Sequence, residues 1–284
     1  MDAWSVQDEL ERLDLTRAED ARVKLVRRIA AVYRDRGLLD YAERRLRLST
    51  KCPRHHVCWQ GDRCRWAPDT GYDAVALPWI GNRYEAERIL VIGTNFHDQG
   101  GLGAHWDICR SHISAMTAGK PGHDGRPYAA RVMSAVRAVR ESRAKRLDEA
   151  WEPPPHTELA DDWESIAYIQ AVKCAPGTAR SAPFRDMYEQ CPSLTLMPEL
   201  EALAPRVVIL LGRSRVRDSV RALLRQDADL EWDTCPGSLE RDTFTINGAA
   251  CTLFCLNHPA ARDARTWKRS LSQLIEQLIA EPVG

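Results

Sequence analysis

The sequence predicts an α/β protein, a three-layer α/β/α sandwich around a central, mainly parallel, four-stranded sheet. Short apolar runs rich in β-branched residues alternate with longer segments of helical periodicity, which is typical of parallel sheets covered by helices on both faces. The four runs predicted to be strands are 88–93, 166–174, 207–212 and 252–257. The four segments predicted to be helices are 128–146, 187–203, 215–224 and 267–279. In such a sheet the active site is expected beside the carboxyl ends of the strands.

The N-terminal part of the chain, residues 1–50, is predicted to be a helical extension to one large domain over residues 51–284. Apolar residues recur at helical spacing among dense charge from Val6 to about Leu48, which indicates two or three amphipathic helices. Of two later segments, 100–125 is rich in glycine and histidine, and 151–162 carries a run of prolines. We expect both segments to be loops.

Composition limits the possible partners. The chain has 284 residues, 44% of them hydrophobic, so it is long enough to bury a full-sized core. Lysine plus arginine and aspartate plus glutamate number 40 each, so any contact with a polyanionic partner must come from a local patch of charge. The sequence has no run of about 18 apolar residues, and its start is too charged for a secretory signal. We therefore expect a cytoplasmic protein without membrane contact. We also expect it to be a monomer.

Nine cysteines, an odd number in a chain without an export signal, indicate metal ligation or buried thiols rather than disulfides. Cys251 and Cys255 lie in an apolar run and are expected to pack in the core, because a free cysteine behaves as a small hydrophobe. Cysteine and histidine are concentrated instead in the segment 52–64, which breaks the helical periodicity. This segment is the first part of the chain that indicates chemistry.

The segment 52–64 holds Cys52, Cys58 and Cys64, with five residues between each cysteine and the next, together with His55 and His56. Four thiolates suit an iron–sulfur cluster. They also suit a zinc ion, and either histidine could replace one thiolate at zinc. The spacing alone does not separate the two metals.

The remaining motifs follow the predicted strands in a fixed order. In chain order they are YIQAVKCAP at 168–176, Cys191, PRVVILLG at 205–212 and LNHPA at 256–260. This ordered set, from Cys52 to the C-terminus, resembles the uracil-DNA glycosylase superfamily and in particular its iron–sulfur branch. The resemblance implies an α/β/α fold, extrusion of a base from DNA, hydrolysis of its glycosidic bond, and a 4Fe-4S cluster held by four cysteines.

The resemblance assigns two cluster ligands to Cys174 and Cys191. The other two are expected among Cys52, Cys58 and Cys64, of which Cys64 is favoured because the lead-in to the first strand follows it. The chain departs from the family here, since the family has a close Cys-x-x-Cys pair where this segment has wider spacing. The preference for iron over zinc therefore rests on the resemblance.

Three residues are candidates for catalysis. The loop after the first strand contains Asn95, where the family places a residue that holds the attacking water, and Asp98 is the alternative water activator. Both could instead only cap the following turn. His258 matches the family's His-Pro motif, whose histidine donates a hydrogen bond to the base oxygen where negative charge collects as the base departs. A lone histidine could also be structural, but its place at a strand end favours catalysis.

Two residues are candidates for binding the base. Gln170 takes the position where uracil-specific members carry an asparagine that recognises the pyrimidine edge, and its extra methylene group misfits plain uracil. Phe96 stands where most members have proline, and a flipped base could stack on its ring, although a core role is equally open. These departures favour a modified pyrimidine. A hypermodified cytosine of phage DNA, removed in defence against phage, is one hypothesis.

Positive charge near the strand ends is needed to hold the DNA backbone. The residues predicted to do so are Lys173, Arg180, Arg262 and Arg265. No lysine occupies a motif position from which it would attack the sugar. We therefore expect a monofunctional enzyme that leaves an abasic site.

Two alternative functions remain open at the level of sequence. One is a uracil-DNA glycosylase of base excision repair. The other is a non-enzymatic nucleic-acid-binding module with a structural zinc, for which the α/β core would be a platform. A nucleotide-binding enzyme is disfavoured, because the loop after the first strand has neither Walker A nor Gly-x-Gly-x-x-Gly spacing.

Overall fold

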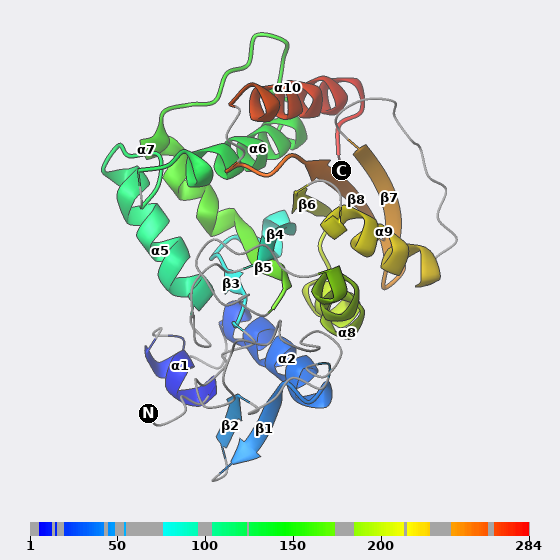
Figure 1. The fold of residues 1–284 in the computed structure, drawn as a ribbon. Helices are drawn as coiled ribbons and strands as arrows, with labels where there is room; N and C mark the ends of the chain where they lie inside the picture. Colours follow the sequence, from blue (N-terminus) through cyan, green and yellow to red (C-terminus); the bar gives the residue numbers. More distant parts are fainter. Residues whose placement is uncertain are drawn as a thin grey trace.

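The fold is that of a computed structural model of the chain (Figure 1). The structure describes residues 6–12, 15, 20–42, 45–48, 54, 76–95, 104–123, 125–173, 185–212, 215–227, 240–260 and 264–283. A six-stranded sheet lies at the centre, with helices on both of its faces.

The predicted α/β class is confirmed. The strand order is β3-β5-β4-β6-β8-β7, and the four inner strands run parallel to one another. The strands are β3 (Trp79–Ile80), β4 (Ile89–Asn95), β5 (Ile166–Val172), β6 (Val207–Leu211), β7 (Glu240–Ile246) and β8 (Ala249–Leu256). The parallel strands occupy the four predicted runs, because strands buried on both faces form near-continuous apolar runs in the sequence.

The sheet has six strands where four were predicted, because each edge carries an antiparallel strand with a weak sequence signal. β3 pairs with β5 through two residues, too few to show a periodicity. β7 pairs with β8 and alternates between buried Phe244 and Ile246 and exposed Thr245. This hairpin turns at Asn247 and Gly248, both with positive φ, as the favoured two-residue turn requires.

Helices cover both faces of the sheet (Figure 1). α6 (Tyr128–Arg143) and α10 (Ala264–Ala280) pack together on one face, and α8 (Arg185–Leu203) and α9 (Arg215–Asp227) pack together on the other. Each falls on a segment predicted to be helical, so the three-layer arrangement is confirmed. Within the described parts of the chain, none of the helices has the length and apolar character needed to cross a membrane.

The segment 100–125, predicted to be a loop, contains the helix α5 (Ala104–Thr117). Its residues 105, 109, 112 and 116 are buried and recur at helical spacing. Two of them are His105 and His112, so polar side chains conceal the buried face in the sequence. The second predicted loop, 151–162, includes the short helix α7 (His156–Leu159) and the start of the 3₁₀ turn η2 (Ala160–Ser165).

The N-terminal extension contains a β-hairpin besides its helices. α1 (Val6–Arg12) and α2 (Ala21–Asp35) are followed by β1 (Leu39–Ala42), which pairs antiparallel with β2 (Arg45–Leu48). Gly37, with a positive φ, ends the helical run, and the alternation of arginine and leucine in β2 has the period of a strand. α2 packs against α8, so the extension shares the core of the large domain.

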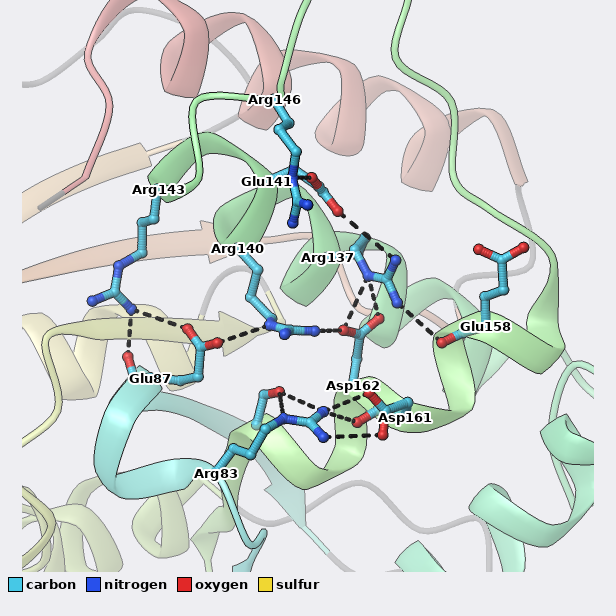
Figure 2. A network of polar contacts seen from close by, with 11 residues as sticks. Arg83, Glu87, Arg137, Arg140, Glu141, Arg143, Arg146, Glu158, Asp161 and Asp162 are labelled. Atoms are coloured by element: carbon cyan, nitrogen blue, oxygen red, sulfur yellow. Dashed lines mark hydrogen bonds and ion pairs between the residues drawn. The ribbon is translucent and has the colours of Figure 1, made fainter.

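An arginine–carboxylate network fixes α6 near the amino ends of the strands, as Figure 2 shows. Asp162 is fully buried and accepts hydrogen bonds from Arg137 and Arg140 of α6. Glu87, the last residue of α4 (Tyr84–Glu87) before β4, also pairs with Arg140. These contacts tie the C-terminal half of α6 to the start of β4. The N-terminus of α6 therefore lies toward the opposite, carboxyl edge of the sheet.

Cys251 and Cys255 of β8 are buried in the core, as predicted. Burial raises the pKa of the Cys251 thiol above its ordinary value. The thiol therefore stays protonated at neutral pH and lacks the thiolate character that reactive cysteines need.

Candidate functional site

Gln170 lies near the carboxyl end of β5, at the centre of the candidate site. Its backbone pairs with Gly93 of the neighbouring parallel strand β4. Tyr168 stands two residues earlier and therefore on the same face of the sheet. Both side chains are buried, with 4% of each residue exposed. The amide predicted to recognise a base is thus held inside the molecule, where hydrogen bonds are strong because water is excluded.

Two tyrosine hydroxyls hold the Gln170 amide, and we call Tyr168 and Tyr128 the tyrosine pair. Gln170 Nε2 donates a hydrogen bond to Tyr168 Oη over 3.0 Å, and Tyr168 Oη lies 2.9 Å from Tyr128 Oη in a second hydrogen bond. Burial raises the pKa of Tyr128 to about 12 and the pKa of Tyr168 well above its ordinary value, so both hydroxyls keep their protons at neutral pH. Gln170 Oε1, in contrast, is buried without a hydrogen-bond partner among the described residues.

Gly93 makes room for this arrangement. A Cβ at position 93 would stand 2.7 Å from Tyr168 Oη and still closer to Gln170 Oε1, well inside van der Waals contact. The amide of Gln170 therefore occupies the space that any other residue at position 93 would fill with its own side chain. Glycine is required here by the close approach of a neighbour.

His258 follows β8, two strands away from β4, and contacts Tyr128. The centroids of the two rings are 5.7 Å apart. The backbone N–H of Ala260 donates to His258 Nδ1 over 3.2 Å, so Nδ1 carries no proton. A neutral His258 therefore carries its proton on Nε2, from which it can donate to an acceptor. Tyr128 contacts this imidazole through its ring and is linked to the Gln170 amide through Tyr168.

The chain around His258 is held by α6 and α10, the two helices that pack together on one face of the sheet. Arg131 of α6 donates a hydrogen bond to the carbonyl of Pro259. Asn257 Nδ2 donates to Ser270 Oγ of α10 over 2.6 Å. A group that acts on a substrate must be positioned by its surroundings in this way.

Aromatic and histidine side chains surround the tyrosine pair. The His105 ring meets Tyr168 edge-on with centroids 5.5 Å apart, and Trp163 meets Tyr168 at 6.0 Å. The His112 ring stacks on Trp163 with 8° between the ring planes and lies 6.1 Å from Tyr128. Burial lowers the pKa of His105 to about 3, so this imidazole is neutral. The sequence analysis did not predict these site residues, which are His105, His112, Tyr128, Trp163 and Tyr168. The helical spacing of the two histidines is a signal that could have indicated a buried face.

The predicted loop after β4 is described only at its start. Asn95 is the last residue of β4 and its backbone pairs with β5, so residue 95 lies at the carboxyl edge of the sheet. Phe96 and Asp98 lie outside the described residues. Of the predicted site, the structure therefore links Gln170 to His258 through the tyrosine pair and puts the backbone of Asn95 at the same edge.

Lys173 lies on the opposite face of the sheet from Gln170 and is buried. Its Nζ lies 2.6 Å from Glu199 Oε1 of α8, with 3% of the lysine side chain and none of the glutamate side chain exposed. Tyr33 of α2 donates a hydrogen bond to the same carboxylate. This ion pair connects the N-terminal extension to α8 and β5, and it does not present the ammonium group to a DNA phosphate.

Of the other three residues predicted to contact DNA, the structure describes one. Arg265 is exposed in the first turn of α10. Arg180 and Arg262 lie outside the described residues.

One of the candidate metal ligands can be placed. Cys191 is buried in α8. Lys173, the residue before Cys174 in the sequence, contacts the same helix through Glu199. The other candidates, Cys52, Cys58, Cys64 and Cys174, lie outside the described residues. Cys191 belongs to the apolar core of buried residues. Within the part of the chain that the structure describes, no group of three or more histidine, cysteine, aspartate or glutamate side chains could hold a metal ion.

Comparison with known proteins assigns no family. No family profile and no curated protein matches the chain. Among solved structures, the chain is similar to a domain of unknown function from Bordetella bronchiseptica, crystallised with bound citrate as a domain-swapped dimer, with 13% identity and a TM-score of 0.27. The match covers 66% of this chain and 41% of the other, so the chain spans less than half the length of that neighbour. A likeness this weak carries no argument about function.

Proposed function

We propose that the protein is a monofunctional DNA glycosylase, which hydrolyses the N-glycosidic bond of an extruded modified base and leaves an abasic site. The observation that carries the proposal is the series of contacts from Gln170 through the tyrosine pair to His258 near the carboxyl edge of the sheet. It joins a buried amide, suited to recognising a base edge, to a neutral imidazole that can donate a proton in a hydrogen bond. The ordered motifs of the sequence support the same reading.

The proposed chemistry uses both groups. When the glycosidic bond breaks, negative charge collects on the departing base and positive charge on the sugar. His258 stabilises the base by donating from Nε2 to one of its oxygens, and Gln170 holds the base edge. A water molecule near residue 95 attacks the anomeric carbon, so that a C–O bond replaces the C–N bond. The electron pair of the C–N bond leaves with the base, which takes up the proton that the water gives up, so the products are a neutral base and a sugar hydroxyl.

The setting of Gln170 supports a modified pyrimidine rather than plain uracil. The glutamine is one methylene longer than the asparagine of the uracil-specific members of the superfamily that the sequence resembles, and its Nε2 is already bonded to Tyr168. The longer side chain places the amide further from the backbone than asparagine would, and the hydrogen bond to Tyr168 holds it there. A site built in this way suits a base that differs from uracil in size or in the groups on its edge.

A metal cluster fits the buried setting of Cys191 and would be held by Cys174, Cys191 and two cysteines of the segment 52–64. Such a cluster, when bound, would brace the fold and take no part in the hydrolysis. Metal analysis of anaerobically purified protein separates the candidate functions. About four irons per chain without zinc supports the glycosylase, and about one zinc without iron supports the binding module.

Mass spectrometry of released bases tests the proposal. The protein is incubated with DNA that contains uracil, with deaminated DNA and with phage DNA that contains hypermodified cytosine. We expect a free modified base and an abasic site, without a covalent adduct after borohydride treatment. Incubation with protein in which His258 is replaced by alanine is the matched control. Release of no base from any of these DNAs would overturn the proposal.

A further inference from the structure

We infer that Tyr168, supported by Tyr128, fixes the orientation of the Gln170 amide and thereby determines which base the site accepts. The inference rests on the proposed function, because it concerns the base that the glycosylase would remove. Tyr168 is a positioning residue in this account, since its hydroxyl acts on the base through Gln170.

The nitrogen of the amide is bonded to Tyr168. Gln170 Nε2 donates to Tyr168 Oη over 3.0 Å. Tyr168 Oη also shares a hydrogen bond with Tyr128 Oη 2.9 Å away, in which either hydroxyl can be the donor. The Tyr168 hydroxyl is therefore held between the Gln170 amide and the Tyr128 hydroxyl.

The oxygen of the amide lies against Gly93, where a Cβ would collide with it. In the reversed orientation Oε1 would stand beside Tyr168 Oη and could accept its proton, whereas the NH₂ group would lie against Gly93. A buried N–H without an acceptor is rarer in proteins than a buried carbonyl without a donor. The contacts therefore favour the orientation in which Oε1 is the unpartnered acceptor.

Packing keeps the hydroxyl of Tyr168 in place. The ring of Tyr168 has His105 at 5.5 Å and Trp163 at 6.0 Å, and 4% of the residue is exposed. The hydroxyl cannot move with a rotating amide without moving these rings, because buried side chains are close-packed. The contacts with Tyr168 therefore keep the acceptor and the remaining donor of the Gln170 amide in a fixed order.

An amide of fixed orientation distinguishes bases of similar shape. A cytosine-type edge carries an amino donor at position 4, where a uracil-type edge carries an oxygen acceptor. A fixed amide pairs with one of these edges and places like groups against the other. An amide that is free to reverse pairs with both.

The test compares Tyr168→Phe with a matched control, Tyr84→Phe. Tyr84 Oη also makes a buried hydrogen bond, 3.0 Å to the carbonyl of Leu203, but lies in α4 before β4 at the amino edge of the sheet. The measurement is kcat/KM on two oligonucleotides whose target bases differ only in an amino or oxo group at position 4. We expect the ratio of the two values to fall about tenfold in Tyr168→Phe, the effect of one buried hydrogen bond, and to stay unchanged in Tyr84→Phe. An unchanged ratio in Tyr168→Phe would overturn the inference.

A readout without activity separates this inference from the proposed function. The side-chain amide signal of Gln170 in an NMR spectrum is identified by its loss in Gln170→Met. Its hydrogen exchange with water is expected to be slow in the wild type and in Tyr84→Phe, and about tenfold faster in Tyr168→Phe. Equal exchange in Tyr168→Phe and the wild type would overturn the inference. Faster exchange in a protein that releases no base would overturn the proposed function and leave the positioning role of Tyr168 supported.

Discussion

The amide of Gln170 occupies the space where any residue other than glycine at position 93 would carry its Cβ. The two residues are paired across the parallel strands β4 and β5. β5 therefore contributes the side chain of Gln170 to the site, and the glycine of β4 leaves the space that this side chain fills. The position of the amide is for this reason sensitive to a single methyl group at residue 93.

Replacement of Gly93 by alanine is expected to displace the Gln170 amide. The added methyl group would stand 2.7 Å from Tyr168 Oη and closer to Gln170 Oε1, so one of them must move. Overpacking of this kind lowers the free energy of unfolding by about 1–3 kcal/mol. Urea denaturation measures the loss of stability, and single-turnover assays are expected to show at least a roughly tenfold loss of base release.

Gly119→Ala is the matched control for this change. Gly119 has a φ of 77° and nothing within 4 Å of its missing Cβ, so alanine there is strained without a collision. We expect about 1–2 kcal/mol of destabilisation and an unchanged rate. Wild-type stability and rate in Gly93→Ala would contradict the close approach described here.

His258→Ala is expected to slow base release without unfolding the protein. Loss of one preorganised donor to a departing group lowers the rate by about 10²–10³-fold. The side chain is only partly buried, so the free energy of unfolding should change by less than about 1 kcal/mol. Single-turnover kinetics and urea denaturation measure the two effects. A wild-type rate in this variant would remove His258 from the catalytic residues.

Lys173→Met is expected to destabilise the protein strongly. It leaves the carboxylate of Glu199, which is fully buried, without its cation. Removal of one partner of a buried ion pair costs about 3–5 kcal/mol, and replacing both partners by apolar residues recovers much of that loss. Urea denaturation of Lys173→Met and of Lys173→Met with Glu199→Leu measures both changes.

The same double variant tests the sequence-based prediction that Lys173 contacts DNA. We expect the dependence of DNA affinity on salt concentration to match that of the wild type, because the ammonium group is buried. A decrease of about one in the slope of log K against log salt would show instead that Lys173 neutralises a phosphate.

The four parallel strands could be predicted because each is buried on both faces and therefore apolar along its length. The helix α5 could not, because His105 and His112 occupy two of its buried positions. The hairpin of β7 and β8 had a usable signal in Asn247-Gly248, which the half-polar composition of β7 obscured. Patterns of hydrophobicity fail where buried positions are polar.

The candidate site was predictable in part for a related reason. Gln170 and His258 stand at strand ends, which local sequence patterns locate. Tyr128 and Tyr168, in contrast, meet through a contact between α6 and β5 that no local pattern encodes. The pairing of Lys173 with Glu199 across β5 and α8 is likewise a tertiary contact, so the sequence could not separate a buried lysine from one that binds phosphate.

The stability of the fold is expected to fall at alkaline pH. Burial raises the pKa values of Tyr33, Tyr84, Tyr128 and Tyr168 above the ordinary value for tyrosine. Above about pH 10 the unfolded chain loses phenol protons that the folded chain retains, so the free energy of unfolding decreases with rising pH. The contribution of Tyr128 is complete below the unfolded pKa and is lost as the pH rises toward its folded value of about 12.

Ultraviolet absorbance of tyrosinate and circular dichroism, recorded together, check this expectation. The four tyrosines with raised pKa values should ionise only as the helical signal is lost. Ionisation of every tyrosine near its ordinary pKa, with the helical signal intact, would contradict the buried setting of the tyrosine pair.

A crystal structure with DNA tests the central claim most directly. The DNA would carry a modified pyrimidine whose 2′-fluoro sugar resists cleavage. We predict that this base is extruded from the duplex, with its edge in hydrogen-bond contact with Gln170 and one of its oxygens in contact with His258 Nε2. A base that remains stacked in the duplex, or an extruded base that contacts neither side chain, would contradict the account.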